Sequence, residues 1–219
     1  QKTAYEIMPS LVGSEMCIRD RMEAIGKWCL ENNVWVIADE IYEHLTYDGH
    51  EHHSIRSLIP ELADTCLIVN GVAKTYAMTG WRLGYSLWPT SLIEHATKLA
   101  INCHSCVNAA TQFAGISALE GPQGSVDKMV SAFNERRSVI VNGLNAITGF
   151  SCKTPIGAFY AFPNIAETGL SSSKLQDLLL DEASVATVAG TSFGHLGEGY
   201  IRFSYANSVE NINICLLYT

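Results

Sequence analysis

Two short apolar runs, each followed by polar residues, set the pattern of the first half of the chain. Residues 34–38 and 65–69 form these runs, and each predicts a strand buried on both faces of a parallel sheet. Before the first run, apolar residues spaced three and four apart from Met22 predict a helix. Ligands bind beyond the carboxyl ends of such strands. We therefore expect Asp39 and Lys74, which follow the two runs, at one edge of a sheet.

Further along the chain, helical and strand patterns alternate over shorter distances. The predicted elements are a strand over 81–88, a largely helical segment over 91–119, a helix over 125–147, a strand over 157–162, a helix over 173–183 that Ser171 or Ser172 caps, and strands over 185–188 and 200–205. Long helices often join two domains. We place a domain boundary inside the helix over 125–147, after which the pattern predicts a small α+β unit.

The two ends of the chain follow neither the helical nor the strand period. The string SLVGSEMCIRDR near the start looks like a translated sequencing adapter, and the ending ICLLYT looks like another. We expect both ends to be non-native and exclude them from the fold. The expected divisions are an artefactual leader at 1–21, a partial large domain at 22–136, a small C-terminal domain at 137–212 and an artefactual tail at 213–219.

Composition and charge exclude several classes of protein. With 219 residues, 47% of them hydrophobic, the chain is globular, and its net charge of −8 with only 14 lysines and arginines argues against a nucleic-acid surface. No run reaches the ~18 consecutive apolar residues of a membrane helix, and no signal-peptide pattern opens the chain. Seven irregularly spaced cysteines favour a reducing compartment, so we expect a cytoplasmic protein without membrane or nucleic-acid partners.

Several familiar motifs are absent or weak. The chain contains neither a Walker A motif nor a G-x-S-x-G elbow, and the loop over 190–194 lacks the G-x-G-x-x-G of a dinucleotide site. Three histidines and a glutamate over 50–53 could bind a metal, but a solvated loop after Asp-Gly is the favoured interpretation. Cys103 and Cys106 have no second pair to complete a four-ligand site. We therefore expect no metal.

The segment around Lys74 carries the strongest chemical signal. A lysine becomes a nucleophile when part of it is neutral, which burial or a neighbouring positive charge promotes, and it can then form a Schiff base with a carbonyl. If that carbonyl belongs to pyridoxal phosphate, an acid must face the ring nitrogen and a cation must hold the phosphate. Asp39 and Arg82 can fill these two positions. Taken singly, Asp39 could equally cap a helix and Arg82 could be structural.

Four motifs in order give the chain a family resemblance. They read DEIY from Asp39, AKTYAMTGWRLGY around Lys74, GAFY from Gly157 and IRFSYA from Ile201. Over residues 22–212 the chain resembles the class I/II aminotransferases of pyridoxal-phosphate fold type I, and within them the bacterial aspartate aminotransferases. The resemblance implies a three-layer α/β/α large domain, here partial, followed by a small α+β domain. It also implies pyridoxal 5'-phosphate as cofactor and a homodimer at full length.

The resemblance also implies a role for five residues. Lys74 would form the Schiff base and move the α-proton of the substrate, and Asp39 would pair with the pyridine nitrogen. Tyr42 would hydrogen-bond the 3'-oxygen of the cofactor, Arg82 would hold the phosphate, and Arg202 would bind the substrate α-carboxylate as a fork. Each residue also has a structural interpretation: Tyr42 could belong to the core, and Arg202 could form a surface ion pair.

Some positions depart from the family pattern. Relatives often carry a hydroxyl three residues before the lysine, where this chain has Gly71. The glycine- and serine-rich phosphate loop, the ring-stacking aromatic and the N-P-x-N-P-T-G stretch are all missing, so we expect the truncated chain to be inactive alone. The implied reaction transfers an amino group between an amino acid, aspartate or glutamate, and a 2-oxo acid. The alternatives are a carbon–sulfur lyase or decarboxylase of the same fold, and a non-catalytic aminotransferase-like sensor domain.

Overall fold

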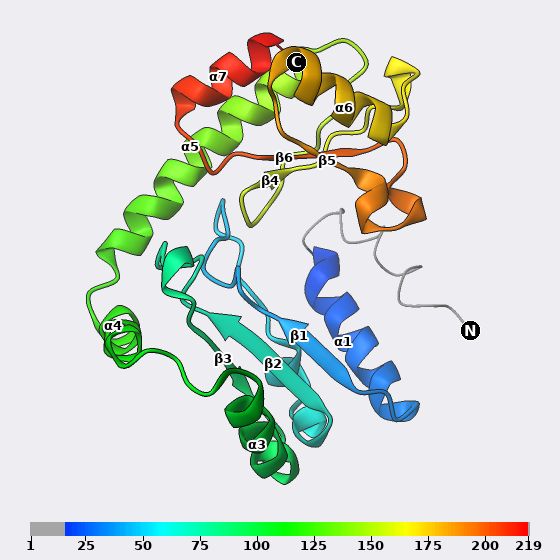
Figure 1. Ribbon diagram of the computed structural model, residues 1–219. Helices are drawn as coiled ribbons and strands as arrows, with labels where there is room; N and C mark the ends of the chain where they lie inside the picture. Colours follow the sequence, from blue (N-terminus) through cyan, green and yellow to red (C-terminus); the bar gives the residue numbers. More distant parts are fainter. Residues whose placement is uncertain (1–15, 219) are drawn as a thin grey trace. The chain divides into compact units, whose positions relative to one another are not determined.

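The computed structural model in Figure 1 describes residues 16–218. The chain divides into two compact units, and the division lies between Lys128 and Met129, within the long helix α5 (Gly124–Ala146). We call them the N-terminal unit and the C-terminal unit and describe each by itself. No helix in the described part is long and apolar enough to span a bilayer.

A three-stranded sheet organises the N-terminal unit. Its order is β1 (Val36–Asp39), β2 (Cys66–Gly71) and β3 (Gly84–Leu87), with β1 parallel and β3 antiparallel to β2. Both apolar runs therefore form neighbouring parallel strands, as predicted. In the register, Asp39 lies opposite Val69, so the carboxyl ends of β1 and β2 reach the same edge of the sheet.

One face of this sheet carries the core of the N-terminal unit. The helix α1 (Met16–Glu31), which runs alongside β1 in Figure 1, packs there with α2 (Ile55–Leu58). The buried residues of this core are Cys29, Ile55, Ile59, Leu62, Cys66 and Ile68. On β1, by contrast, Ile37 is 71% exposed. The prediction that 34–38 is buried on both faces is therefore wrong: alternate side chains of β1 point away from the core.

The segment after β3 forms two helices rather than one continuous helical stretch. They are α3 (Ile93–His104) and α4 (Ala109–Glu120). Ser105 ends α3 with a φ of 60°, in the left-handed region, and Asn108 begins α4 by accepting hydrogen bonds from the amides of Ala110 and Thr111 at 2.9 and 3.4 Å. A polar side chain that caps a helix start is favourable, which explains the break within 91–119.

Short 3-10 helices connect several of these elements. They are η3 (Pro60–Asp64), η4 (Thr79–Trp81), η5 (Thr90–Leu92), η6 (Ala166–Thr168), η7 (Gly190–Phe193) and η8 (His195–Gly197). Because η4 ends at Trp81 and Arg82 after it adopts a left-handed φ of 55°, the strand β3 begins only at Gly84 and is shorter than predicted.

The C-terminal unit contains both helices and a small sheet. Its sheet has the order β4 (Tyr160–Ala161), β6 (Ile201–Ser204) and β5 (Val188–Ala189), all antiparallel neighbours. The helices α6 (Ser172–Ala183) and α7 (Val209–Tyr218) belong to the same unit. The strand predicted over 157–162 shrinks to two residues because Ala158 adopts a φ of 58°.

Aromatic and aliphatic side chains fill the core of the C-terminal unit. Phe133 on α5 stacks on Phe159 with ring centroids 5.4 Å apart and meets the edge of Tyr205 at 6.4 Å. Leu144 and Ile201 are fully buried. The ring pairs add geometric specificity to a core that the apolar stripe of α5 predicts.

The segments that the sequence analysis set aside continue two of these helices. Residues 16–21 begin α1, and residues 213–218 end α7. Residues 1–15 and Thr219 lie outside the described part, so most of the predicted leader is not covered by the structure.

Two side chains accept hydrogen bonds from backbone amides at the N-terminus of α6. The Ser171 hydroxyl accepts a hydrogen bond from the Lys174 amide at 3.3 Å, which confirms the first of the two predicted caps. Glu198 accepts the Ser172 amide at 2.8 Å, and the Ser172 hydroxyl lies 3.3 Å from the same oxygen. The bond from the Ser172 amide lowers the pKa of Glu198, because it favours the charged carboxylate.

Glu198→Gln should change how the stability of the chain depends on pH. A lowered pKa means that the ionised carboxylate stabilises the fold above the unfolded-state value of 4.5, and that this contribution is lost as the pH falls through the lower folded-state pKa. Urea unfolding should therefore show the wild-type advantage over Glu198→Gln at pH 6.5 but not at acid pH. Glu167→Gln, an exposed glutamate in η6, is the control. A pH-independent difference would contradict the assignment.

The cysteines differ sharply in burial. Burial raises the pKa of the Cys152 thiol to about 11, whereas Cys103 and Cys106 are exposed. A thiol reacts as its thiolate. Ellman's reagent at pH 8 should therefore label Cys103 and Cys106 rapidly and Cys152 only after unfolding. Replacing Cys103 and Cys106 with serine should remove two fast equivalents, and fast labelling of Cys152 in the folded chain would contradict this prediction.

Candidate active site

The carboxyl edge of the N-terminal sheet carries the first of the predicted site residues. Asp39 is the last residue of β1, and the amide of Glu40 continues the ladder by donating to the Val69 carbonyl at 2.9 Å. The Asp39 carboxylate is exposed and accepts the amide of Ile41 at 3.2 Å. This bond starts a turn, not a helix, so the alternative role of Asp39 as a helix cap is wrong.

The turn after β1 brings Tyr42 to Lys74. Lys74 follows β2 in a tight turn of its own, in which the Tyr76 amide donates to the Val72 carbonyl at 3.2 Å. The Lys74 ammonium nitrogen lies 6.0 Å from the centre of the Tyr42 ring, at the outer limit of a cation–π contact. Both residues are half-buried. Two residues from separate strand ends, predicted to share one site, thus lie together at this edge.

The segment that follows Lys74 has an unusual backbone. Ala77 and Arg82 adopt φ values of 52° and 55°, in the left-handed region that non-glycine residues rarely occupy. Arg82 is exposed and donates from Nη1 to the Thr79 carbonyl at 3.0 Å. Such conformations persist where the surrounding structure fixes them, and they cluster at ligand sites.

Gly71 explains one departure from the family pattern. A Cβ at this position would lie 3.0 Å from the Leu83 carbonyl oxygen and 3.1 Å from the Gly84 Cα. Both neighbours are backbone atoms of the paired strand, so they cannot move aside as a flexible side chain would. A serine or threonine here would therefore require the paired backbone to shift by a few tenths of an ångström, and with glycine in place phosphate binding would depend on Arg82 and backbone amides.

Two residues that fix the edge were missed by the sequence analysis. The buried Asn70 side chain donates to the Glu43 carboxylate at 2.7 Å and accepts the amide of Gly71 at 2.7 Å. These bonds tie the end of β2 to the turn that carries Tyr42. The Asn-Gly pair signalled only a strand end, because its partner Glu43 is remote in sequence and no local spacing connects them.

Tyr76 and Tyr85 both interact with the Glu43 carboxylate, which accepts the hydrogen bond from Asn70. Burial raises the pKa of Tyr85, and the carboxylates of Glu43 and Glu40 and the Tyr76 hydroxyl raise it further. Burial and Glu43 likewise raise the pKa of Tyr76. Both therefore remain neutral phenols, which can donate and accept hydrogen bonds without adding charge to the site.

Arg202 lies in the C-terminal unit, on β6. Its guanidinium lies close to two aromatic rings, 4.4 Å from the centre of Tyr160 and 4.8 Å from that of Phe193. Of the described residues, none forms a hydrogen bond or an ion pair with this guanidinium. The predicted alternative of a surface ion pair is therefore wrong within the described part. Tyr160 and Phe193 are two further residues that the sequence analysis missed.

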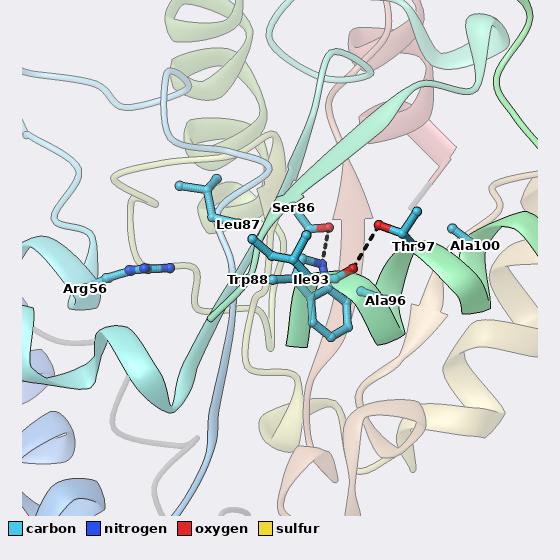
Figure 2. Close-up of a pocket in the computed structure, with 8 residues that line it drawn as sticks. All are labelled: Arg56, Ser86, Leu87, Trp88, Ile93, Ala96, Thr97 and Ala100. Carbon is cyan, nitrogen blue, oxygen red and sulfur yellow. Dashed lines mark hydrogen bonds between the residues drawn. The ribbon is translucent and has the colours of Figure 1, made fainter. Parts of the chain in front are cut away.

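A cavity lies elsewhere in the N-terminal unit. It has a volume of about 510 Å³, and none of the five predicted site residues lines it. Figure 2 shows that its walls come from Arg56, the end of β3 and one side of α3, with Trp88 bonded to Ser86 at 2.8 Å. None of its lining residues is a lysine.

Comparison with known proteins decides the family. The model of the family described as aminotransferase class I and II matches residues 16–216. The chain belongs to this family. Class I and II aminotransferases use pyridoxal 5'-phosphate, and solved structures of the family share the predicted fold type I. The match includes residues 16–21 and 213–216, which the sequence analysis set aside.

Individual relatives support the same placement. The chain is 42% identical to aspartate aminotransferase of Streptomyces avermitilis over 220 residues, covering 96% of this chain and 53% of the relative. The identity to the Geobacillus stearothermophilus aspartate aminotransferase is 42% over 196 residues, covering 87% and 49%. The crystal structure of an aromatic aminotransferase from Pyrococcus horikoshii gives a TM-score of 0.87 at 38% identity, covering 91% and 53%. This aminotransferase chain thus spans about half the length of the curated relatives it matches.

Proposed function

We propose that the full-length protein containing this chain transfers an amino group between aspartate or glutamate and a 2-oxo acid. The observation that carries the proposal is the approach of Lys74 to Tyr42 beside the end of β1, in a chain of the aminotransferase family. The named aspartate aminotransferases among its relatives support the choice of substrate.

The chemistry of the side chains fits the cofactor of the family. The cofactor carries an aldehyde that reacts with an amine, a pyridine nitrogen that a carboxylate keeps protonated, and a phosphate that a guanidinium can bind. Lys74, Asp39 and Arg82 offer these groups within one unit, and Tyr42 adds a phenol. When bound, pyridoxal phosphate supplies an electron sink next to the reacting carbon.

We assign the following roles to residues of this chain. Lys74 holds the cofactor and moves the proton at the substrate Cα, a task for which a half-buried amine next to an aromatic ring is suited. The exposed carboxylate of Asp39 would pair with the pyridine nitrogen and keep it charged. Arg202 would bind the substrate α-carboxylate, because its planar fork has no hydrogen-bond or ion-pair partner among the described residues and lies within cation–π distance of the rings of Tyr160 and Phe193.

The proposal extends to the whole protein. We infer a cytoplasmic homodimer in which a partial large domain at 22–136 and a small domain at 137–212 belong to the same subunit. Amino-acid and 2-oxo-acid substrates would be its small-molecule partners. Gel filtration of the full-length protein should give twice the subunit mass, and a monomer would contradict the dimer.

The reaction itself can be tested on the full-length protein with pyridoxal phosphate. Aspartate and 2-oxoglutarate should yield oxaloacetate and glutamate in equal amounts. Release of ammonia with pyruvate would instead indicate a lyase, and release of CO₂ a decarboxylase. If the protein binds cofactor and amino acid but forms no product, the sensor alternative replaces the enzyme. Faster turnover with phenylalanine than with aspartate would move the substrate to the aromatic class.

A further inference from the structure

A second group of polar side chains gathers at the turn that carries Tyr42. Glu40 and Glu43 belong to this turn, and His52 comes from the histidine-rich loop at 50–53. Each offers one ligand atom, and the three atoms all lie within 4.8 Å of one another. The sequence predicts a solvated loop here, because nothing in the local spacing indicates that His52 returns to the end of β1.

One oxygen of the Glu40 carboxylate has no hydrogen-bond partner among the described residues. The Glu40 side chain is only 8% exposed, and its Oε1 atom is buried without any hydrogen-bond partner in the described part. Its Oε2 lies 3.4 Å from Nε2 of His52. A buried carboxylate oxygen left unpaired is unfavourable, so a cation bound by the Glu40 carboxylate would remove a destabilising feature of the fold.

The distance between the Glu40 carboxylate and the His52 imidazole suits a small divalent ion. Two ligands bound at about 2.1 Å to a tetrahedral centre are about 3.4 Å apart, by the geometry of zinc sites. Oε2 of Glu40 and Nε2 of His52 are the same distance apart, and the ligand atom of Glu43 lies within 4.8 Å of the other two. One imidazole and two carboxylates are ligands that zinc uses, with water in the fourth position.

A second layer of contacts orients one of the ligands. Asn70 donates to Oε1 of Glu43 at 2.7 Å, so the carboxylate has a fixed direction. Hydrogen bonds of this kind from outside the ligand set are usual at metal sites. The same bond joins the cluster to the end of β2, next to the segment that carries Lys74.

The charge around the cluster also favours a cation. Glu40 and Glu43 line a cavity of about 460 Å³ together with Arg56. Two carboxylates and one guanidinium leave one negative charge when His52 is neutral and His44, whose Nε2 lies 3.5 Å from Oε1 of Glu43, is neutral as well. Arg56 also has a buried Nη1 without a hydrogen-bond partner in the described residues, so a direct pair between Arg56 and Glu40 is the competing arrangement.

We propose that Glu40, Glu43 and His52 bind a divalent ion of the zinc type. The ion links the loop at 50–53 to the turn after β1, and it thereby holds the turn between Asp39 and Tyr42 in place. This structural site goes beyond the proposed transfer of amino groups, and its existence is independent of that activity.

Cobalt is the probe for this site, in the 219-residue chain without pyridoxal phosphate. Cys103→Ser and Cys106→Ser are made first, because both thiols are exposed and could bind the ion. The metal-free chain is titrated with Co²⁺, and binding is followed by visible absorption and by the melting temperature. One Co²⁺ should bind per chain, without a thiolate charge-transfer band, and should raise the melting temperature.

Matched variants of the loop assign the ligands. His52→Asn should weaken Co²⁺ binding by about 10-fold or more and abolish the rise in melting temperature. His53→Asn, in the same loop, should leave both unchanged. Glu40→Gln should act as His52→Asn does, and His52→Asn alone decides the matter if Glu40→Gln fails to fold. Absence of Co²⁺ binding, or equal binding by the wild type and His52→Asn, would overturn the proposal in favour of an Arg56–Glu40 pair.

Discussion

Lys74→Ala in the full-length protein should lower kcat for amino-group transfer by about 10²–10⁴-fold, the range expected when a positioned acid–base group is removed. No other lysine follows the carboxyl end of a sheet strand in the described part, because β1 ends at Asp39 and β3 at Leu87. The proton at the substrate Cα would then have to move through water. Steady-state kinetics with aspartate and 2-oxoglutarate measures the loss.

A second lysine provides the control for this result. Lys98 on α3 is exposed and pairs with Glu94 at 2.7 Å. Lys98→Ala should therefore keep the wild-type kcat, because an exposed ion pair contributes little even to stability. Added methylamine should restore part of the activity of Lys74→Ala, as a free amine can replace the missing one. A Lys74→Ala protein with undiminished kcat would remove Lys74 from the mechanism.

Arg202→Ala should raise KM for the amino acid by about 100-fold, because a bidentate guanidinium–carboxylate pair contributes about 3 kcal/mol. The guanidinium lies 4.4 and 4.8 Å from the centres of Tyr160 and Phe193, so it is oriented before the substrate arrives. Arg202→Lys should raise KM less, since an ammonium keeps the charge but loses the fork. Cofactor affinity should be unchanged in both variants.

Arg136 offers a matched comparison within the same unit. Its guanidinium lies 5.3 Å from the centre of the Phe133 ring, so it makes the same kind of contact without a predicted substrate role. Arg136→Ala should leave KM at the wild-type value. An Arg202→Ala protein with unchanged KM, or an equal rise of KM in Arg136→Ala, would show that Arg202 does not bind the carboxylate.

Local signals in the sequence predict most of the elements. The apolar runs before Asp39 and Lys74 place both residues at one sheet edge, and the structure confirms the parallel pairing of β1 with β2. The long helix α5 and the serine cap of α6 are also confirmed. The strands, the helix and the cap each depend on neighbours within a few residues, so pattern and capping rules suffice to find them, whereas the pairing of the two strands follows from the rule that buried apolar strands form parallel sheets.

Features that depend on distant residues could not be predicted in the same way. Asn70 and Glu43 are 27 residues apart in sequence, yet their bond fixes the turn that carries Tyr42. The rings around Arg202 come from two other segments of the chain. The exposed face of β1 escaped prediction because a short apolar run looks the same whether one or both of its faces are buried.

Chemical labelling tests the central claim that Lys74 holds the cofactor. The full-length protein is incubated with pyridoxal phosphate, reduced with borohydride, digested and analysed by mass spectrometry. We expect one phosphopyridoxyl group per chain on the peptide that contains Lys74, and none at this level in Lys74→Ala. Stoichiometric label on any other lysine, with Lys74 unmodified, would contradict the assignment.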